Sequence, residues 1–245
     1  MEKITKGYSS IPHLSGSKMT SKEDIRLLNG EEYFTIKTKE KKDKVLILEK
    51  IDGCCISVRR DGDTLIPATR NGFSIDDGQY AHIKAFLPFL EENKEVFLSA
   101  LADGETVYGE WTFAEHGTPI SAYKKLFYPF DIVGVDGKIP YIDVQRRFDG
   151  VSEKIGSPEV IAFSPTRPEK IYNWTLAGCE ADCGLDEWSD DTTVWADGSY
   201  EYALEQGHCQ PFEWFIYRSE KIRNGKLVIE LAKWVRPGYE SNTPE

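Results

Sequence analysis

The chain has 245 residues, of which 40% are hydrophobic and 29% are charged, so it can bury a sizeable core and is not a disordered chain. Its net charge of −11 counts against a protein that grips nucleic acid with its whole surface, so a polynucleotide must meet a local basic face, or a partner protein must help. No apolar run approaches the ~20 residues that span a bilayer, no signal peptide opens the sequence, and the cysteines form no disulfide framework. These features predict a cytoplasmic protein with no membrane partner.

The first part of the chain changes from mixed polar sequence to a strand pattern. Residues 1–43 are polar, and the run from Ser21 to Asp24 predicts a short capped helix. Three apolar or alternating segments follow, separated by Asp-Gly signals that are typical of tight turns. We predict that these segments form an antiparallel meander, at residues 45–49, 55–60 and 65–69.

The middle of the chain combines a helical pattern with further strands. Apolar residues recur at helical spacing over residues 80–97, which predicts an amphipathic helix that is kinked or restarted at Pro88. Pro129 lies within the second strand pattern and marks an edge or a bulge. Strands are expected at residues 106–111 and 126–133, and a hairpin turn at residues 135–138.

The last part of the chain contains an irregular segment and a final hairpin. An acidic insertion rich in Trp and Asp, around residues 178–210, shows no periodicity. Two strands are expected after it, at residues 212–218 and 227–235, with a turn at residues 223–225. Together these elements predict a strand-rich α+β fold.

Cysteine and histidine residues of the insertion raise a zinc site as an alternative to free thiols. Cys179 and Cys183 have an acceptable ligand spacing, but His208 and Cys209 are adjacent, which strains tetrahedral geometry. We therefore expect free cysteines.

A Lys-x-Asp-Gly sequence, Lys50 to Gly53, stands at the end of the first apolar strand. Lysine attacks phosphorus only when it is neutral, so a nucleophilic lysine needs burial or cationic neighbours near pH 7. Taken alone, this pattern is more often a surface lysine before a β-turn. Its meaning therefore depends on the motifs around it.

Six motifs follow one another in a fixed order along the chain. They are Glu49-Lys50-Ile51-Asp52-Gly53, Thr69-Arg70-Asn71-Gly72, Tyr108-Gly109-Glu110-Trp111, Phe130-Asp131-Ile132, Glu213-Trp214-Phe215-Ile216-Tyr217-Arg218 and Ala232-Lys233-Trp234-Val235-Arg236. The series resembles the covalent nucleotidyltransferase superfamily of ligases and capping enzymes. Within it, the chain resembles the ATP-dependent RNA ligases of the branch related to the phage T4 nick-sealing enzyme. The resemblance covers roughly residues 10–237.

This resemblance implies a fold and an activity. The expected fold is a nucleotidyltransferase (adenylation) domain of two antiparallel sheets flanked by helices, spanning residues 1–245 as one domain without a separate OB domain. The expected activity joins 3′-hydroxyl and 5′-phosphate ends of RNA through a lysyl-AMP intermediate and an adenylylated 5′-end. The expected cofactors are ATP and Mg²⁺ (or Mn²⁺). RNA ends or nicks are the expected substrate, with DNA as a possibility.

The resemblance also implies contacts with the nucleotide. Lys50 corresponds to the adenylylated lysine, and Glu49 to a residue that accepts from the adenine amino group. Arg70 corresponds to the arginine near the ribose and phosphates. Glu110 corresponds to the carboxylate that binds the ribose hydroxyls, and Phe130 to the aromatic residue that stacks on adenine.

The last two motifs imply the metal and phosphate contacts. Glu213 corresponds to a carboxylate that helps to hold the metal, and Arg218 occupies a position where the family carries Lys or Arg. Lys233 is the expected phosphate contact, and Arg236 is expected to supply a second catalytic charge. Two features depart from the family pattern: Trp214 stands where glycine is usual, and the last motif has one lysine instead of two.

Several alternatives share the first step or the fold. One is a DNA-nick ligase, and another is a capping-type nucleotidyltransferase that uses GTP. A third, from a different class, is a non-catalytic relative that binds nucleotides or RNA ends, which would bind ATP without forming a covalent adduct.

Overall fold

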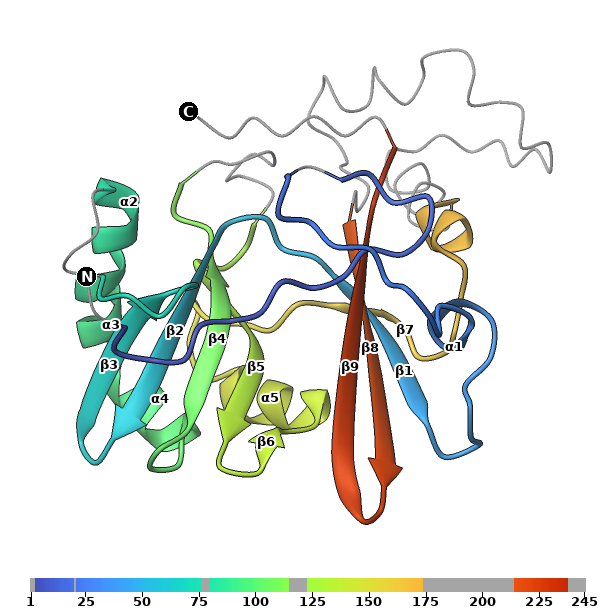
Figure 1. Ribbon diagram of the computed structural model, residues 1–245. Helices are drawn as coiled ribbons and strands as arrows, with labels where there is room; N and C mark the ends of the chain where they lie inside the picture. The colour runs from blue at the N-terminus through green and yellow to red at the C-terminus, as the bar shows by residue number, and fades with distance from the viewer. Residues whose placement is uncertain (1–2, 20, 76–79, 115–122, 174–213, 238–245) are drawn as a thin grey trace, which may run out of the picture.

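Two antiparallel sheets form the protein in a computed structural model that describes residues 3–19, 21–75, 80–114, 123–173 and 214–237 (Figure 1). The four-stranded sheet has the spatial order β7 (Val160–Ala162), β1 (Lys44–Glu49), β8 (Trp214–Arg223), β9 (Lys226–Val235). The five-stranded sheet has the order β3 (Thr64–Thr69), β2 (Cys54–Asp61), β4 (Thr106–Trp111), β5 (Phe127–Gly134), β6 (Gly137–Lys138). The predicted α+β fold of two antiparallel sheets is confirmed, and the described residues contain no separate OB domain.

Short helices accompany the sheets. Those whose bounds lie within the described residues are α1 (Glu32–Thr35), α2 (Ala81–Lys84), α3 (Phe86–Glu92), α4 (Lys94–Ala100) and α5 (Tyr141–Phe148). Helices α3, α4 and α5 bury their apolar residues in a core shared with the five-stranded sheet. Among the described residues, no helix has the length and apolar character needed to cross a bilayer.

The predicted three-stranded meander is wrong in its first strand. β2 and β3 form the expected hairpin, but β1 pairs with β7 and β8 in the other sheet. The reason is that β1 is buried on both faces: Leu46 and Leu48 pack in one hydrophobic core, and Val45 and Ile47 pack in a second. A strand buried on both faces needs a partner along each edge, which the adjacent hairpin does not supply.

The connection between β1 and β2 therefore crosses from one sheet to the other, and it carries the Lys-x-Asp-Gly motif (Figure 1). At Gly53 the chain passes very close to β4: a Cβ atom added there would lie 2.5 Å from the carbonyl oxygen of Trp111. Only glycine permits this approach. Gly53 of the motif is thus required by the close packing of the backbone against β4, apart from any chemistry of Lys50.

Of the two helices predicted before β4, the one over residues 80–97 is present in three pieces and the one at Ser21 is absent. The pattern over residues 80–97 forms three short helices, and Pro88 lies in the first turn of α3, where its missing N–H has no helical partner to lose. The helix expected at Ser21 is instead a turn. The backbone N–H of Ser21 donates to Asp24 Oδ2 at 2.9 Å, and that of Glu23 donates to Ser21 Oγ at 3.1 Å. Such side-chain bonds to the backbone compete with helix formation.

A bulge interrupts the pairing of β4 with β5. Tyr108 pairs with Asp131 and Gly109 pairs with Pro129, so Phe130 between them has no cross-strand partner. Pro129 therefore lies directly beside a bulge, on a part of β5 that the short strand β6 does not reach, since β6 pairs only with Val133 and Gly134. The extra residue changes the direction of the side chains, which matters because Phe130 belongs to the candidate site.

The N-terminal strap, residues 7–14, joins the two sheets across their gap (Figure 1). The backbone N–H of Tyr8 donates to the carbonyl of Arg70 at 2.8 Å, beyond the end of β3. The backbone N–H of Lys233, on β9, donates to the carbonyl of Pro12 at 2.8 Å. The strap therefore fixes the spacing of the sheets where the candidate site lies.

Candidate functional site

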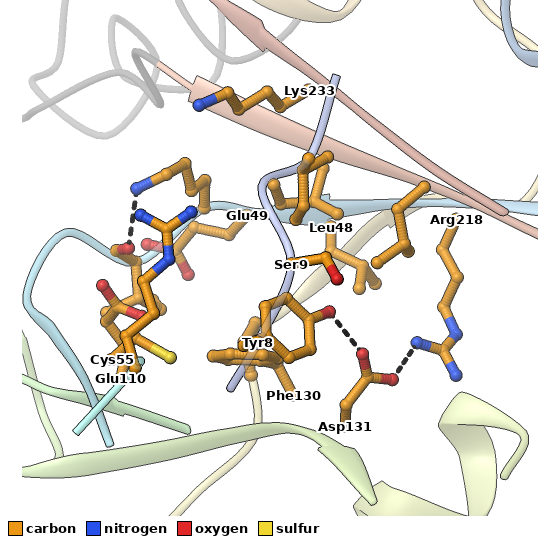
Figure 2. A pocket seen from close by; sticks show the side chains of 17 residues that line it. Tyr8, Ser9, Leu48, Glu49, Cys55, Glu110, Phe130, Asp131, Arg218 and Lys233 are labelled. Atoms are coloured by element: carbon orange, nitrogen blue, oxygen red, sulfur yellow. Dashed lines mark hydrogen bonds and ion pairs between the residues drawn. The ribbon is translucent and has the colours of Figure 1, made fainter. Parts of the chain in front are cut away.

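A pocket opens between the two sheets beside the N-terminal strap (Figure 2). All seven residues expected to contact a nucleotide line it: Glu49, Lys50, Arg70, Glu110, Phe130, Arg218 and Lys233. They come from both sheets and from segments far apart in the sequence. The fold therefore brings the ordered motifs together in one place.

Lys50 stands directly after β1, where the chain leaves the four-stranded sheet. Its backbone N–H donates to the carbonyl of Trp214 at 3.2 Å, which holds the start of the crossing against β8. The half-buried side chain donates from Nζ to the carbonyl of Ile51 at 3.2 Å. The amine is thus presented to the pocket from backbone that is fixed by sheet pairing.

The amine of Lys233 belongs to a small network with Asp24 and His13. Its Nζ donates to Asp24 Oδ1 at 2.9 Å, and the same oxygen lies 3.1 Å from Nε2 of His13, which is fully buried. Burial lowers the pKa of Lys233; the contact with Asp24 opposes this, and the nearby charges of Lys50 and Arg70 lower the pKa further. The pocket therefore holds three cations that repel one another and would be stabilised by an anion.

Arg70 completes this cationic group from the five-stranded sheet. It follows β3, is exposed, and donates from Nη2 to Ser10 Oγ at 3.0 Å. The contact ties its guanidinium to the N-terminal strap. Cations on the two sides of the gap can thus contact a phosphate chain from opposite directions.

Two carboxyl groups of the pocket have raised pKa values. Burial and the neighbouring Glu159 raise the pKa of Glu49 to about 7. Burial raises the pKa of Glu110 to about 7 as well; Asp52 acts in the same direction, while Lys50 and Arg70 oppose the shift. Both carboxyl groups can therefore change protonation near neutral pH, where a bound ligand could change the ratio of their protonated and ionised forms.

These shifts predict a pH dependence of stability. Between the ordinary pKa of a glutamate and about 7, the folded protein binds more protons than the unfolded chain, so the free energy of unfolding falls as pH rises through this window. Replacing Glu110 with glutamine removes one of the two groups. We expect the variant to be about 1 kcal/mol more stable than the unmodified protein at pH 8, with a smaller gain or none at pH 5.

Urea unfolding of both proteins at pH 5, 6, 7 and 8 measures this difference. Glu91→Gln, on the exposed surface of α3, is the matched control for losing one carboxyl group. Equal pH slopes for the Glu110→Gln variant and the unmodified protein would contradict the prediction.

The deep end of the pocket is an ion-pair network (Figure 2). Arg218 on β8 is 1% exposed; its Nη1 lies 2.5 Å from Asp131 Oδ1, its Nε lies 2.7 Å from Glu220 Oε1, and its Nη2 donates to the carbonyl of Ile139. Burial alone would raise the pKa of Asp131, but Arg218 and Lys138 together hold it below its ordinary value. Arg218 thus lines the pocket while its guanidinium is bonded to protein groups.

The family model for RNA ligase matches residues 43–224. The chain belongs to the RNA ligase family. No match was found among curated proteins.

Solved structures show only distant similarity to this RNA ligase family member. They include a protein from Aquifex aeolicus provisionally named an ATP-dependent DNA ligase (TM-score 0.44, 12% identity, 94% of this chain and 50% of that one). Two forms of an archaeal ATP-dependent RNA ligase also match: form 1 (TM-score 0.43, 12% identity, 95% and 48% coverage) and form 2 (TM-score 0.39, 12% identity, 80% and 43% coverage). The chain spans half the length of these proteins or less.

Of the other expected site residues of this family member, one does not line the pocket and one cannot be placed. Arg236 follows β9 and is half-buried, but it is absent from the pocket lining. Glu213, the expected metal ligand, lies outside the described residues. The acidic insertion around residues 178–210 and its cysteine and histidine residues also lie outside them. Within the described residues, Cys54 and Cys55 form no disulfide bond.

Sequence reasoning missed the contribution of the N-terminal strap to the pocket. Tyr8, Ser9 and Ile11 all line it. Tyr8 donates its hydroxyl to Asp131 Oδ2 at 2.5 Å, and its ring meets that of Phe130 edge to face at 5.2 Å between centroids. The strap has no periodic pattern, and its backbone pairing with both sheets together with the contacts of Tyr8 brings it to the site.

Proposed function

We propose that the protein is an ATP-dependent RNA ligase that carries AMP on Lys50. The observation that carries this proposal is the placement of Lys50 in one pocket with two other cations, Arg70 and Lys233. A fixed amine beside two cations suits attack on a phosphoanhydride, because positioning and charge neutralisation supply most of the catalysis of phosphoryl transfer. Membership in the RNA ligase family supports the same reaction class.

In the first step, neutral Nζ of Lys50 attacks the α-phosphorus of ATP. A nitrogen–phosphorus bond forms, the bond to the bridging oxygen of pyrophosphate breaks, and the amine proton passes to solvent. Lys233 and Arg70 offset the negative charge that develops on the phosphates.

The remaining pocket residues suit the nucleoside part of ATP. Phe130 offers an apolar face for adenine, as aromatic side chains do for ring systems. Glu110 lies beside Lys50 and can accept hydrogen bonds from ribose hydroxyls when it is ionised. Glu49, at the end of β1, can accept from the adenine amino group.

Two further transfers complete the proposed reaction. An oxygen of the 5′-phosphate attacks the adenylyl phosphorus, the nitrogen–phosphorus bond breaks, and Lys50 leaves as an amine with a proton taken from solvent. A 3′-hydroxyl then attacks the activated 5′-phosphate and gives its proton to solvent, so that the phosphodiester forms and the bond to AMP breaks. Each step is a phosphoryl or nucleotidyl transfer, so the same cations can serve all three.

A divalent metal ion, Mg²⁺ or Mn²⁺, fits this scheme as a partner of the phosphates. The described residues hold no cluster of three or more His, Cys, Asp or Glu that could bind a metal ion by themselves. Mg²⁺ commonly uses one or two carboxylates with substrate phosphates and waters. Glu213 is our candidate for such a carboxylate, and the metal would supply charge neutralisation.

RNA as the substrate rests on family membership, and the chemistry leaves DNA as the alternative. The net charge of −11 argues against tight binding of a polynucleotide by the whole surface. We therefore propose that RNA ends or nicks meet only the cationic mouth of the pocket, with a partner protein aiding capture.

The test is covalent labelling of the purified protein. The protein is incubated with α-labelled ATP or GTP, magnesium or manganese, and pyrophosphatase, and the denatured chain is examined for label. We expect label from ATP and not from GTP, followed by sealing of nicked duplexes that contain RNA. Absence of label from both nucleotides, with intact mass excluding a pre-existing adenylate, would overturn the proposal.

A further inference from the structure

The amine of Lys50 lies against an aromatic ring. Its Nζ is 3.9 Å from the centroid of the Trp214 indole. Both side chains are half-buried. A lysine ammonium within about 6 Å of a ring centroid is attracted to the ring face, most strongly in the case of tryptophan. The contact therefore acts on the atom that the proposed reaction uses as its nucleophile.

Strand register explains why Trp214 meets Lys50. Glu49 pairs with Phe215 at the end of the β1–β8 ladder, and the backbone N–H of Lys50 donates to the carbonyl of Trp214 at 3.2 Å. Lys50 and Trp214 are thus the next opposite pair. Side chains directly opposite each other in an antiparallel pair lie on the same face of the sheet, within contact distance.

The identity of the residue at this position is therefore consequential. A residue without a ring at this position would remove the aromatic face from the Lys50 amine. The lysine side chain has four rotatable carbon–carbon bonds, and its amine also donates a hydrogen bond to the carbonyl of Ile51 at 3.2 Å. The indole supplies a second restraint from the opposite strand.

We propose that Trp214 is a positioning residue for Lys50: its indole face holds the amine at the pocket, so that Nζ spends more time where it can attack. This inference rests on the proposed function for its catalytic consequence, but the contact itself does not. Removing the ring should slow attack on ATP, because an amine that samples several rotamers reaches the reactive geometry less often. It should leave ATP binding largely unchanged, since no part of Trp214 lines the pocket.

Two substitutions separate the ring face from simple packing. Trp214→Phe keeps an aromatic face, and Trp214→Leu keeps apolar bulk without one. In single-turnover labelling with ATP, we expect the maximal rate to fall about 10-fold in the leucine variant and by less than about 3-fold in the phenylalanine variant. The ATP concentration at half-maximal rate should change by less than about 2-fold in both. Equal rates in the two variants, with equal thermal unfolding midpoints, would overturn the proposal.

A second measurement does not depend on ligase activity. Lysine residues are acylated with an activated ester at one pH, and the extent is read on the peptide containing Lys50 relative to that containing Lys226, an exposed lysine at the β8–β9 turn. We expect acylation of Lys50 to rise at least about 3-fold in Trp214→Leu, because the indole covers one side of the amine and its loss lets a small reagent approach from that side.

Unchanged acylation in the leucine variant would overturn the contact itself. If the unmodified protein fails to label with ATP while acylation responds as expected, the proposed function fails and the placement of Lys50 by Trp214 stands. If the unmodified protein labels with ATP while acylation of Lys50 is unchanged in Trp214→Leu, the proposed function stands and the placement of Lys50 by Trp214 fails.

Discussion

Replacing Lys50 with alanine is expected to abolish covalent labelling by ATP, by at least about 1,000-fold, because the amine that forms the bond to phosphorus is removed. Lys50→Arg should be equally inactive, since a guanidinium keeps the positive charge but does not lose its proton near neutral pH. The measurement is label retained on the denatured chain after incubation with α-labelled ATP and metal.

Lys44→Ala is the matched control for this prediction. Lys44 begins the same strand, β1, but it is exposed and absent from the pocket lining. We expect the control to label at the rate of the unmodified protein. Label at normal levels on Lys50→Ala would show that another residue carries the nucleotide, and the assignment of Lys50 would be wrong.

Replacing Arg218 with methionine is expected to cost about 3–5 kcal/mol of unfolding free energy, measured by urea denaturation. Arg218 and Asp131 are each only 1% exposed, and Arg218 also pairs with Glu220. The substitution leaves both carboxylates buried without their main cation. Lys138 and Tyr8 still contact Asp131, which keeps the expected cost within this range and not above it.

Two further variants test the origin of this cost. Arg146→Met breaks an exposed pair with Asp143 on α5 and should cost less than about 1 kcal/mol. Adding Asp131→Asn to Arg218→Met should recover part of the lost stability, because it removes an uncompensated buried charge. A cost for Arg218→Met as small as that of the exposed control would mean that the network contributes little.

The ion pairs of Arg218 stabilise the fold and also hold together the elements that border the pocket. Asp131 follows directly on Phe130, the extra residue of the β5 bulge, and it accepts a hydrogen bond from Tyr8 of the N-terminal strap. One carboxylate thereby ties together β5, β8 and the strap around the deep end of the pocket (Figure 2). Loss of this network is expected to disturb nucleotide binding even where the protein stays folded.

Several features could be predicted because they depend on short-range sequence signals. The final hairpin is an example: Asn224 and Gly225 both have positive φ, which is the requirement of the tight turn that their sequence indicated. Likewise, Pro129 indicated an interruption in its strand, and the β4–β5 bulge confirms it. Local backbone chemistry is sufficient for such features, because the residues that decide them are neighbours in the chain.

Other features could not be predicted from local patterns. The sequence gives no signal that β1 belongs to a different sheet from β2, since the burial of both faces of β1 depends on residues that come much later in the chain. Helix α5 and strand β7 were not predicted, because both are short and depend on packing against β5 and β1. The place of Arg218 in a buried network was equally hidden, since its partner Asp131 lies 87 positions away.

By itself, the sequence determined the order of the motifs, the α+β character and the residue types available for nucleotidyl transfer. Tertiary structure alone decided that Glu49, Lys50, Arg70, Glu110, Phe130, Arg218 and Lys233 share one pocket, and that the N-terminal strap joins them. The physical reason is that sheet pairing is non-local. Strands lie side by side because they form hydrogen bonds and bury apolar side chains with segments distant in the chain, and turn signals between neighbouring residues do not determine these partners.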